Sequence, residues 1–422
     1  MKIYVLFCFI AFNTICILQN SFSQSINNVY QVKSINPSDT NTDDLKFLDK
    51  ILLNNEILFL GEKAHGEGNI TLAKTRLIKY LNVKLGYNII VFESGFYDAC
   101  MMNKIIKMRK KPETIFWAAF QSILYNTKEF NKLKIFLING IKNNSIKLCG
   151  IDNQLGAISY NTLITNISNK LKTANYTIDS ISVGLINKYI WNKNGSKYGY
   201  FENSTDSVML FHTLDSLVYF SENLNSEKDN LIAQSVKNLL TILKLNIKDY
   251  YDVPFYIRAS ERDAQMADNL LWIYRHKEPK DKIIVWTASM HSARNIFLIK
   301  EVSDTIFYKN YVTMGQIVHD SIGDKMYSLA FTASGGYYQT PYMMKDSVQI
   351  KSVENNSVES FFKNRSIKYG LVNFQNTDTT GYFWNELYSN PHGNSNVKAI
   401  WPKIHDGIFY IDTIHPPTLI KK

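Results

Sequence analysis

Short apolar runs alternate with longer stretches of helical spacing along most of this chain. Four consecutive apolar residues at 57–60 predict a buried strand, because a strand covered on both faces carries no polar side. The same reasoning predicts strands at 88–94, 146–152, 281–286 and 325–333. Before and between these runs, apolar spacings near 3.6 predict helices at 43–53, 72–85, 97–108, 128–142, 261–275 and 314–322. Strands that alternate with helices in this way predict an α/β fold with a mainly parallel sheet flanked by helices.

The pattern changes at residues 158–250, which have helical spacing and no strand signal. We predict that they form a helical insertion that caps the strand ends and supplies the walls of a pocket. Residues 24–157 and 251–422 would then form the catalytic α/β domain on either side of it.

The two ends of this domain show weaker patterns. Polar residues dominate 24–45, which we expect to be a loose lead-in. After residue 337 the chain has short strand candidates near 348–350, 369–373 and 407–411, which we expect at the sheet edge.

The first 23 residues have the pattern of a signal peptide. Lys2 precedes an apolar run at 3–18, and the small residues Ser21 and Ser23 favour cleavage before Gln24. The run is shorter than the ~20 residues that a membrane-spanning helix needs. We therefore expect an exported protein, periplasmic or secreted, with no transmembrane segment after cleavage.

Cleavage would leave two cysteines, Cys100 and Cys149. Two cysteines in an exported protein can form a disulfide. Both lie in apolar surroundings, which suit two buried free thiols equally well. The sequence leaves this choice open.

Composition narrows the class of partner. The chain has 422 residues, 45% of them hydrophobic and 20% charged, which is typical of a globular protein. Its net charge of +10 comes from scattered lysines, without an arginine-rich run or a basic stripe interleaved with aromatic residues. We therefore expect a small-molecule partner and no nucleic acid.

Ionisable residues follow three of the predicted strands. Glu62 and His65 come after 57–60, Glu93 ends the second strand, and His291 follows 281–286. Because the carboxyl ends of parallel strands share one edge of the sheet, these side chains are expected to meet there. Asp152 ends a further strand, where we expect it to cap a helix.

A neutral imidazole beside a carboxylate is suited to general-base chemistry, since its reference pKa is ~6.5. The sequence has no Gly-x-Ser-x-Gly elbow, and Ser94 and Ser289 lack its flanking glycines. The residues therefore favour hydrolysis by a His-activated water over a serine nucleophile.

Other roles are open to these residues. Glu62 and Glu93 could be structural ion-pair partners of Lys74 or Arg76. The cluster Glu62, His65, Glu93 and His291 also has the ligand types of a divalent-metal site. No His-x-x-x-His pair supports such a site, so we expect no metal and no other cofactor.

Three nearby residues are expected to be structural. Arg262 and Asp263 would pair with each other on the helix 261–275. Trp286 is expected to belong to the core of its strand.

Several segments carry a resemblance to a known family. Leu60-Gly-Glu-Lys-Ala-His-Gly66 resembles the Gly-Glu-x-x-His-Gly signature of the erythromycin esterase family. Segments that resemble its later blocks follow in the same order, at 73–81, 92–95, 150–154, 261–269, 286–294, 314–316 and 331–332. The resemblance covers roughly residues 50 to 335.

The resemblance implies hydrolysis of a macrolide lactone, as in antibiotic resistance, by a His-activated water with little or no dependence on metal. It implies that His65 is the general base and that Glu62 and Glu93 orient it and the water. His291 would assist the substrate carbonyl together with a basic residue, for which Lys74 and Arg294 are the candidates.

Two positions depart from the family pattern. Lys74 stands where an arginine is expected, and Ala288 stands where the first of two histidines is expected. The second departure indicates another ester or lactone as substrate. It also leaves open an exported binding protein for haem, a metal or a small polar ligand, or a role in cell-surface polysaccharide metabolism, with which some sequences resembling the family are associated.

Overall fold

The computed structural model describes residues 28–120, 122–173, 177–191, 204–222, 227–339, 347–393 and 395–420. The predicted signal peptide lies outside these residues. Within the described ranges, no helix is both long enough and apolar enough to cross a membrane.

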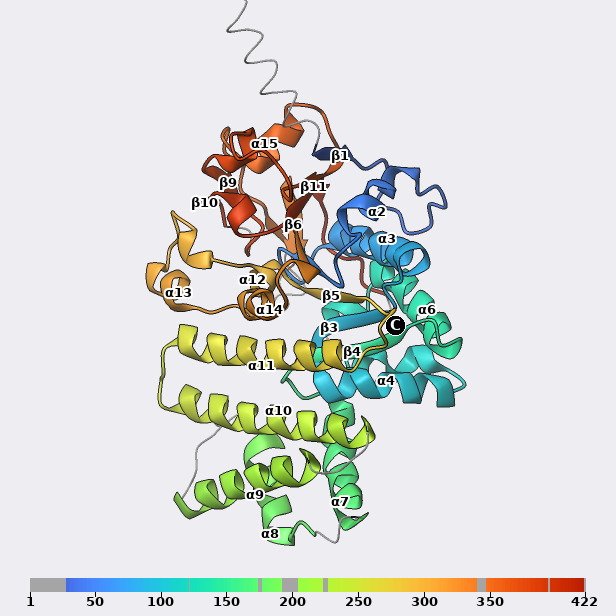
Figure 1. Ribbon diagram of the computed structural model, residues 1–422, viewed down its shortest axis with the longest axis vertical. Helices are drawn as coiled ribbons and strands as arrows, with labels where there is room; N and C mark the ends of the chain where they lie inside the picture. The colour runs from blue at the N-terminus through green and yellow to red at the C-terminus, as the bar shows by residue number, and fades with distance from the viewer. Residues whose placement is uncertain are drawn as a thin grey trace, which may run out of the picture.

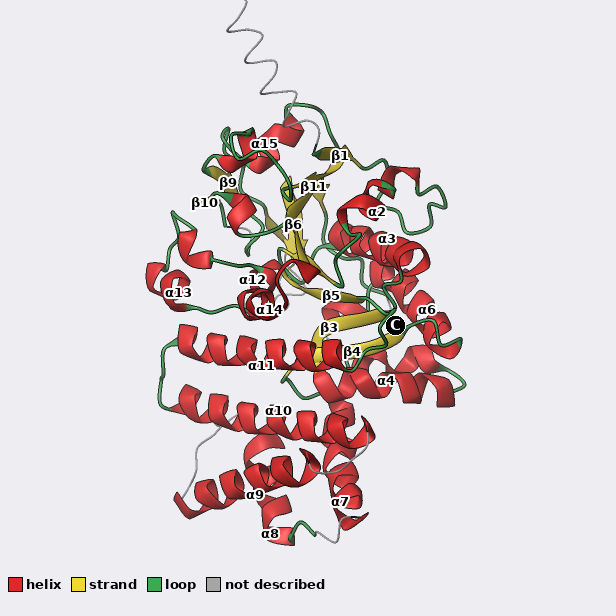
Figure 2. Cartoon of the chain, in the orientation of Figure 1, coloured by secondary structure: helices red, strands yellow, loops and turns green. Residues whose placement is uncertain are grey.

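A nine-stranded sheet organises the chain, with helices on both of its faces (Figure 1, Figure 2). Six neighbouring strands are parallel, in the order β11 (Gly407–Ile414), β6 (Met326–Gln339), β2 (Ile57–Glu62), β5 (Ile283–Ala288), β3 (Ile89–Gly95) and β4 (Lys147–Asp152). Three strands are antiparallel to a neighbour: β8 (Tyr369–Asn373), β1 (Val29–Gln31) and β7 (Ser347–Gln349). The predicted α/β fold with a mainly parallel sheet is confirmed.

Burial on both faces explains the unbroken apolar runs of the central strands. Leu58 and Leu60 pack into a core that includes α3 (Gly68–Leu85) and α6 (Lys128–Lys142). Their neighbours Ile57 and Phe59 point to the other face, where α11 (Phe255–Arg275) and α14 (Met314–Ile322) pack. Successive residues of each strand therefore enter different cores.

The remaining helices and short strands complete the layers. They are α2 (Phe47–Ile51), α4 (Phe96–Met108), α5 (Ser122–Tyr125), α7 (Ile164–Thr173), α8 (Ser180–Ile186), α9 (Ser204–Glu222), α10 (Glu227–Tyr250), α12 (Ser289–Ser292), α13 (Thr305–Asn310), α15 (Val358–Lys363), β9 (Leu387–Ser389) and β10 (Val397–Ala399). The helices predicted at 128–142 and 314–322 have the observed bounds of α6 and α14. Gly86 ends α3 with a φ of 73°, the left-handed conformation that glycine adopts at low cost.

Helices α7 to α10 of the segment 158–250 lie beyond α4 and α11, away from β6 and β11 (Figure 1). Helix α10 packs against α11, with Gln234 donating to Asn269 at 2.8 Å. The described elements of this segment are helical, as its pattern predicted.

Two expectations about the ends of the α/β domain are wrong. The lead-in at 24–45 contributes β1, which forms the sheet edge by pairing with β8. The tail strand β11 lies inside the sheet between β6 and β8. Residues 407–411 are all buried, which is why this run is apolar throughout.

Cys100 of α4 and Cys149 of β4 form a disulfide. Their Cα atoms are 4.1 Å apart. Of the two possibilities that the sequence left open, the structure has the disulfide.

Candidate active site

The strand order places a crevice at the carboxyl ends of β2, β5 and β3. Strands β2 and β3 follow each other in the chain, yet β5 lies between them, and β6 lies on the other side of β2. The chain therefore adds strands first on one side of β2 and later on the other side. Open α/β sheets bind ligands at the point where the strand order changes direction in this way. Glu62 is the last residue of β2, and Glu93 lies near the end of β3.

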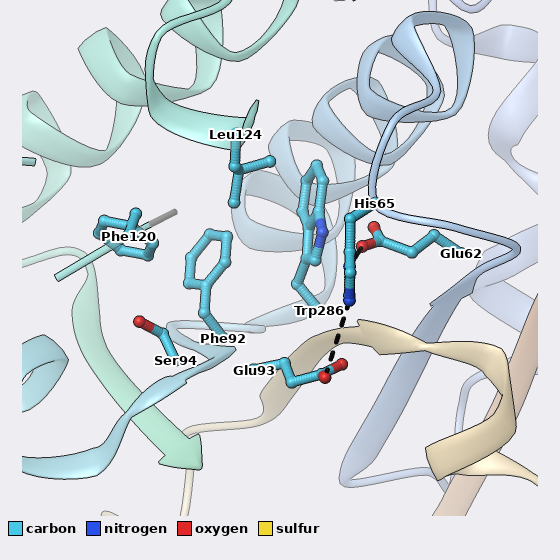
Figure 3. Close-up of a pocket in the computed structure, with 8 residues that line it drawn as sticks. All are labelled: Glu62, His65, Phe92, Glu93, Ser94, Phe120, Leu124 and Trp286. Carbon is cyan, nitrogen blue, oxygen red and sulfur yellow. Dashed lines mark hydrogen bonds and ion pairs between the residues drawn. The ribbon is translucent and has the colours of Figure 1, made fainter. Parts of the chain in front are cut away.

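Glu62 and His65 form an imidazole–carboxylate dyad at this edge (Figure 3). The His65 Nδ1 atom is 2.7 Å from Glu62 Oε1, and Lys74 Nζ donates to Glu62 Oε2 at 2.6 Å. Lys74 comes from α3 and is fully buried. With Nδ1 held, the imidazole directs Nε2 toward Glu93 Oε1, 3.9 Å away.

The loop that carries His65 is fixed on both sides. Glu67 accepts the Ala64 N–H at 3.1 Å, and the Gly66 carbonyl accepts the Gln339 N–H at 2.9 Å. A Cβ atom at Gly66 would lie 1.6 Å from the Gln339 carbonyl oxygen, so only glycine fits here. The loop therefore lies directly against the end of β6.

A second dyad approaches from the opposite side. The His291 Nδ1 atom is 2.7 Å from Asp263 Oδ1, and His291 Nε2 is 3.3 Å from Glu93 Oε1. Tyr311 donates to the other Asp263 oxygen at 2.7 Å, as does the Met314 N–H at 2.8 Å. Both imidazoles are thus held at Nδ1 by a carboxylate and direct Nε2 at Glu93.

Glu93 is the centre of the cluster. Its Oε2 accepts the Thr287 hydroxyl at 2.8 Å and the Ala288 N–H at 2.9 Å. Arg262 Nη2 is 3.2 Å from Oε1 and 2.5 Å from Asp152 Oδ2. The ends of β3, β4 and β5 are therefore joined through the Glu93 carboxylate and the Arg262 guanidinium.

The carboxylates keep both imidazoles protonated to high pH. Burial opposes the charge on His65, but the hydrogen bond that its Nδ1–H donates to Glu62 and the charge of Glu93 raise its pKa to about 9. Burial also opposes the charge on His291, and there Asp263 and Glu93 raise the pKa to about 10. Burial works against ionised Glu93 too, yet His291, His65 and Arg262 hold its pKa well below the usual range.

A cleft opens beside His65 (Figure 3). One side is polar and the other is aromatic or aliphatic, and the lining residues are Glu62, His65, Glu93, Ser94, Phe92, Phe120, Leu124 and Trp286. Phe120 and Leu124 come from the segment between α4 and α6. Of the residues that the structure describes within 158–250, none lines this cleft, although that segment was expected to supply the pocket walls.

The structure brings together Glu62, His65, Glu93 and His291, with Lys74 beneath Glu62. It places the sixth predicted residue, Arg294, elsewhere, since Arg294 donates to both oxygens of Asp406 at 2.8 and 3.0 Å.

Sequence reasoning missed three members of the cluster. Asp152 was expected to cap a helix, and Arg262 and Asp263 to pair with each other. Asp263 carried a signal, because it falls three and seven residues before the buried Met266 and Leu270, on the apolar stripe of α11. A charged residue on such a stripe needs a buried partner.

The donor set fits a metal ion poorly. Both Glu62 oxygens already bind cationic or protonated partners, and Arg262 stands beside Glu93. Among the residues that the structure describes, no group of three or more His, Cys, Asp or Glu side chains is arranged to hold a metal. The absence of a cofactor stays a prediction, which chelation can test.

Comparison with known proteins identifies the family of this chain. The family model described as erythromycin esterase matches residues 83–414, a span that includes Glu93 and His291 and begins after the loop of His65. The putative hydrolase YbfO of Bacillus subtilis (strain 168) is 24% identical, with 96% of this chain and 97% of that protein covered. Erythromycin esterase type II of Escherichia coli is 23% identical, with 90% and 94% covered.

A solved structure agrees in fold. The erythromycin esterase EreC, as a mutant in its open conformation, superposes with a TM-score of 0.68 at 14% identity, covering 93% of this chain and 100% of that one. The family match extends over more than half of the chain, and the chain therefore belongs to the erythromycin esterase family.

Proposed function

We propose that this protein hydrolyses a carboxylic ester or a lactone with a water molecule that His65 activates. Family membership supports a hydrolase with a small-molecule substrate. The observation that carries the finer proposal is the Glu62–His65 dyad, whose Nε2 faces Glu93 across 3.9 Å at the cleft. That distance is too long for a direct hydrogen bond, so a water molecule can be held by both groups.

The proposed reaction has two steps. The water oxygen attacks the carbonyl carbon while His65 Nε2 takes a water proton, which gives a tetrahedral oxyanion. The bond from carbon to the leaving oxygen then breaks, and the His65 imidazolium returns the proton to that oxygen. The products are a carboxylic acid and an alcohol, joined in one molecule when the substrate is a lactone.

The two histidines have different roles in this proposal because their pKa values differ. His65 has the lower pKa of the two, about 9, and so is the first to become a neutral base as the pH rises. His291, with a pKa of about 10, stays cationic and can stabilise negative charge on the substrate. Lys74 is bound to Glu62 and buried, so we assign it to holding that carboxylate and not to binding the oxyanion.

The test is turnover by the protein from Gln24 onward, against erythromycin and a panel of simple esters and lactones. His65→Ala is expected to lose roughly 10²- to 10⁴-fold in kcat, since the general base is removed. His319→Ala is the matched control, because His319 lies on α14 with a partly exposed side chain. Turnover should be unaffected by a chelator.

Two outcomes would contradict the proposal. One is a His65→Ala variant that retains full turnover of every accepted ester. The other is a folded protein that hydrolyses nothing and purifies with a chromophore or a stoichiometric metal, which would favour the binding protein. Turnover of simple esters without turnover of erythromycin would agree with the effect expected from Ala288.

We also propose that the protein is exported. The N-terminal pattern of charge, apolar run and small residues supports this, and so does the Cys100–Cys149 disulfide, which is typical of oxidising compartments. Fractionation of cells and N-terminal sequencing of the mature chain test it, with Gln24 expected as the first residue.

A further inference from the structure

Trp286 belongs to both the core and the cleft. The residue is 2% exposed, and its ring stacks on Phe92 with ring centroids 5.6 Å apart. These contacts fit the core residue that the sequence predicted. Yet Trp286 also lines the cleft together with His65 and Glu93 (Figure 3).

The indole N–H of Trp286 is buried without an acceptor among the residues that the structure describes. Two other tryptophans show the usual arrangement: Trp401 donates to the Leu387 carbonyl at 2.9 Å, and Trp384 donates to Thr377 at 2.8 Å. Because buried donors are normally paired, an unpaired one calls for an explanation. In Figure 3 the indole nitrogen lies on the side of the ring that faces His65.

Lys74 strengthens this donor. Its Nζ lies 4.4 Å from the centroid of the Trp286 ring, in cation–π contact. A cation at the ring face draws electron density from the indole, which makes the N–H a better hydrogen-bond donor. Lys74 is bound to Glu62 and is buried, so it affects the cleft by polarising the Trp286 ring.

We propose that Trp286 Nε1–H donates a hydrogen bond to the carbonyl oxygen of the ester or lactone and to the oxyanion formed from it. This rests on the proposed function and adds to it a donor that touches the reacting group. The donor is fixed by a core strand and shielded from bulk water, which is the arrangement that stabilises developing negative charge. The group next to the carbonyl would lie along Phe92 and Phe120, so an ester with an apolar or planar acyl group fits the cleft.

Two replacements of Trp286 test the donor. Trp286→Phe removes the N–H and keeps an aromatic ring, and 3-benzothienylalanine at position 286 removes it with little change of shape. Each is expected to lower kcat roughly 10²- to 10³-fold with KM changed only a few-fold, because the oxyanion gains more from the donor than the ground state does. Trp272→Phe is the control, since Trp272 packs on Phe96 and His276, away from the lining residues.

A measurement on the intact protein covers the case in which the variants fold poorly. The ¹⁵N-labelled chain has six indole N–H groups, and the signal absent from Trp286→Phe belongs to Trp286. The monoanion of ethyl phenylphosphonate, which mimics the tetrahedral intermediate, should move that proton signal downfield and leave that of Trp272 in place.

The outcomes separate this inference from the proposed function. If His65→Ala abolishes turnover but the benzothienyl variant keeps the wild-type kcat, the hydrolase stands and the Trp286 donor is refuted. An unmoved Trp286 signal in protein saturated with the phosphonate refutes it as well. Turnover that survives His65→Ala refutes the proposed function itself.

Discussion

His65 and His291 have the same kind of support but different access to solvent. Each imidazole is held at Nδ1 by a carboxylate and faces Glu93 with Nε2. The His65 side chain is 32% exposed, whereas that of His291 is 13% exposed. The more exposed imidazole is the one that can exchange its proton with water, which agrees with its assignment as the base.

The assignment of His65 as the base and His291 as the cation predicts an alkaline, bell-shaped pH profile of kcat/KM. The rising limb should lie near pH 9, where His65 loses its proton, and the falling limb near pH 10, where His291 loses its own. Asp263→Asn removes a negative charge from His291 and lowers its pKa, so the falling limb should move to lower pH.

Profiles from pH 6 to pH 11 measure this shift. Asp320→Asn is the control, because the Asp320 side chain is 64% exposed on α14. A falling limb that stays in place in Asp263→Asn would separate His291 from the reaction.

Lys74 and Glu62 form a buried ion pair whose disruption should be costly. Lys74→Met leaves the buried Glu62 carboxylate without its cation, which is expected to lower the free energy of unfolding by about 3–5 kcal/mol. Lys46→Met breaks an exposed pair with Asp43 and should leave the free energy of unfolding almost unchanged. Urea unfolding of the two variants measures the difference, and equal costs would contradict the burial argument.

The loop between β2 and α3 is the element on which the site depends. It turns at the end of a core strand, carries His65, and is pressed against β6 through Gly66 and Gln339. Because the obstructing atom belongs to the backbone, a side chain at Gly66 can be accommodated only if the loop moves.

Gly66→Ala should therefore displace His65. We expect kcat to fall about 10²-fold, as for a misplacement of about 1 Å, with a loss of stability of about 1–3 kcal/mol from overpacking. Gly335→Ala is the matched control on β6, where no described atom beyond the neighbouring residues lies within 4 Å of the added Cβ. Steady-state kinetics and thermal unfolding of both variants provide the comparison; wild-type kcat in Gly66→Ala would show that the loop adapts.

Local pattern was sufficient to predict the elements that position the site. Apolar runs ending in Glu62 and Glu93 identified the strands, and the carboxyl ends of parallel strands must share an edge. The local sequence pattern does not show how a helix is rotated about its own axis in the folded protein. The rotation of α11 brings Arg262 to Asp152, 110 residues earlier, and Asp263 to His291. Arg294 likewise pairs with Asp406, which lies 112 residues later in the chain.

At the scale of the whole molecule, the disulfide ties α4 to the edge strand β4. It joins residues 49 apart, for which loop-closure entropy gives a stabilisation of about 4 kcal/mol. The double variant Cys100→Ser, Cys149→Ser should unfold at correspondingly lower denaturant concentration. Dithiothreitol should destabilise the wild type in the same way and leave the double variant unchanged. Two titratable thiols in the unfolded, unreduced chain from Gln24 onward would contradict the pairing.

The position of β5 also has a consequence for the order in which the protein can fold. Strands β2 and β3 are never neighbours, since the strand between them begins only at Ile283. A nascent chain that ends before this residue cannot close the centre of the sheet, and long-range strand pairing of this kind is slow. Glu93 therefore meets Thr287, Ala288 and His291 late, after two-thirds of the chain has been made. Such a delay would keep the chain unfolded for longer, which is the state that the proposed export through a membrane requires.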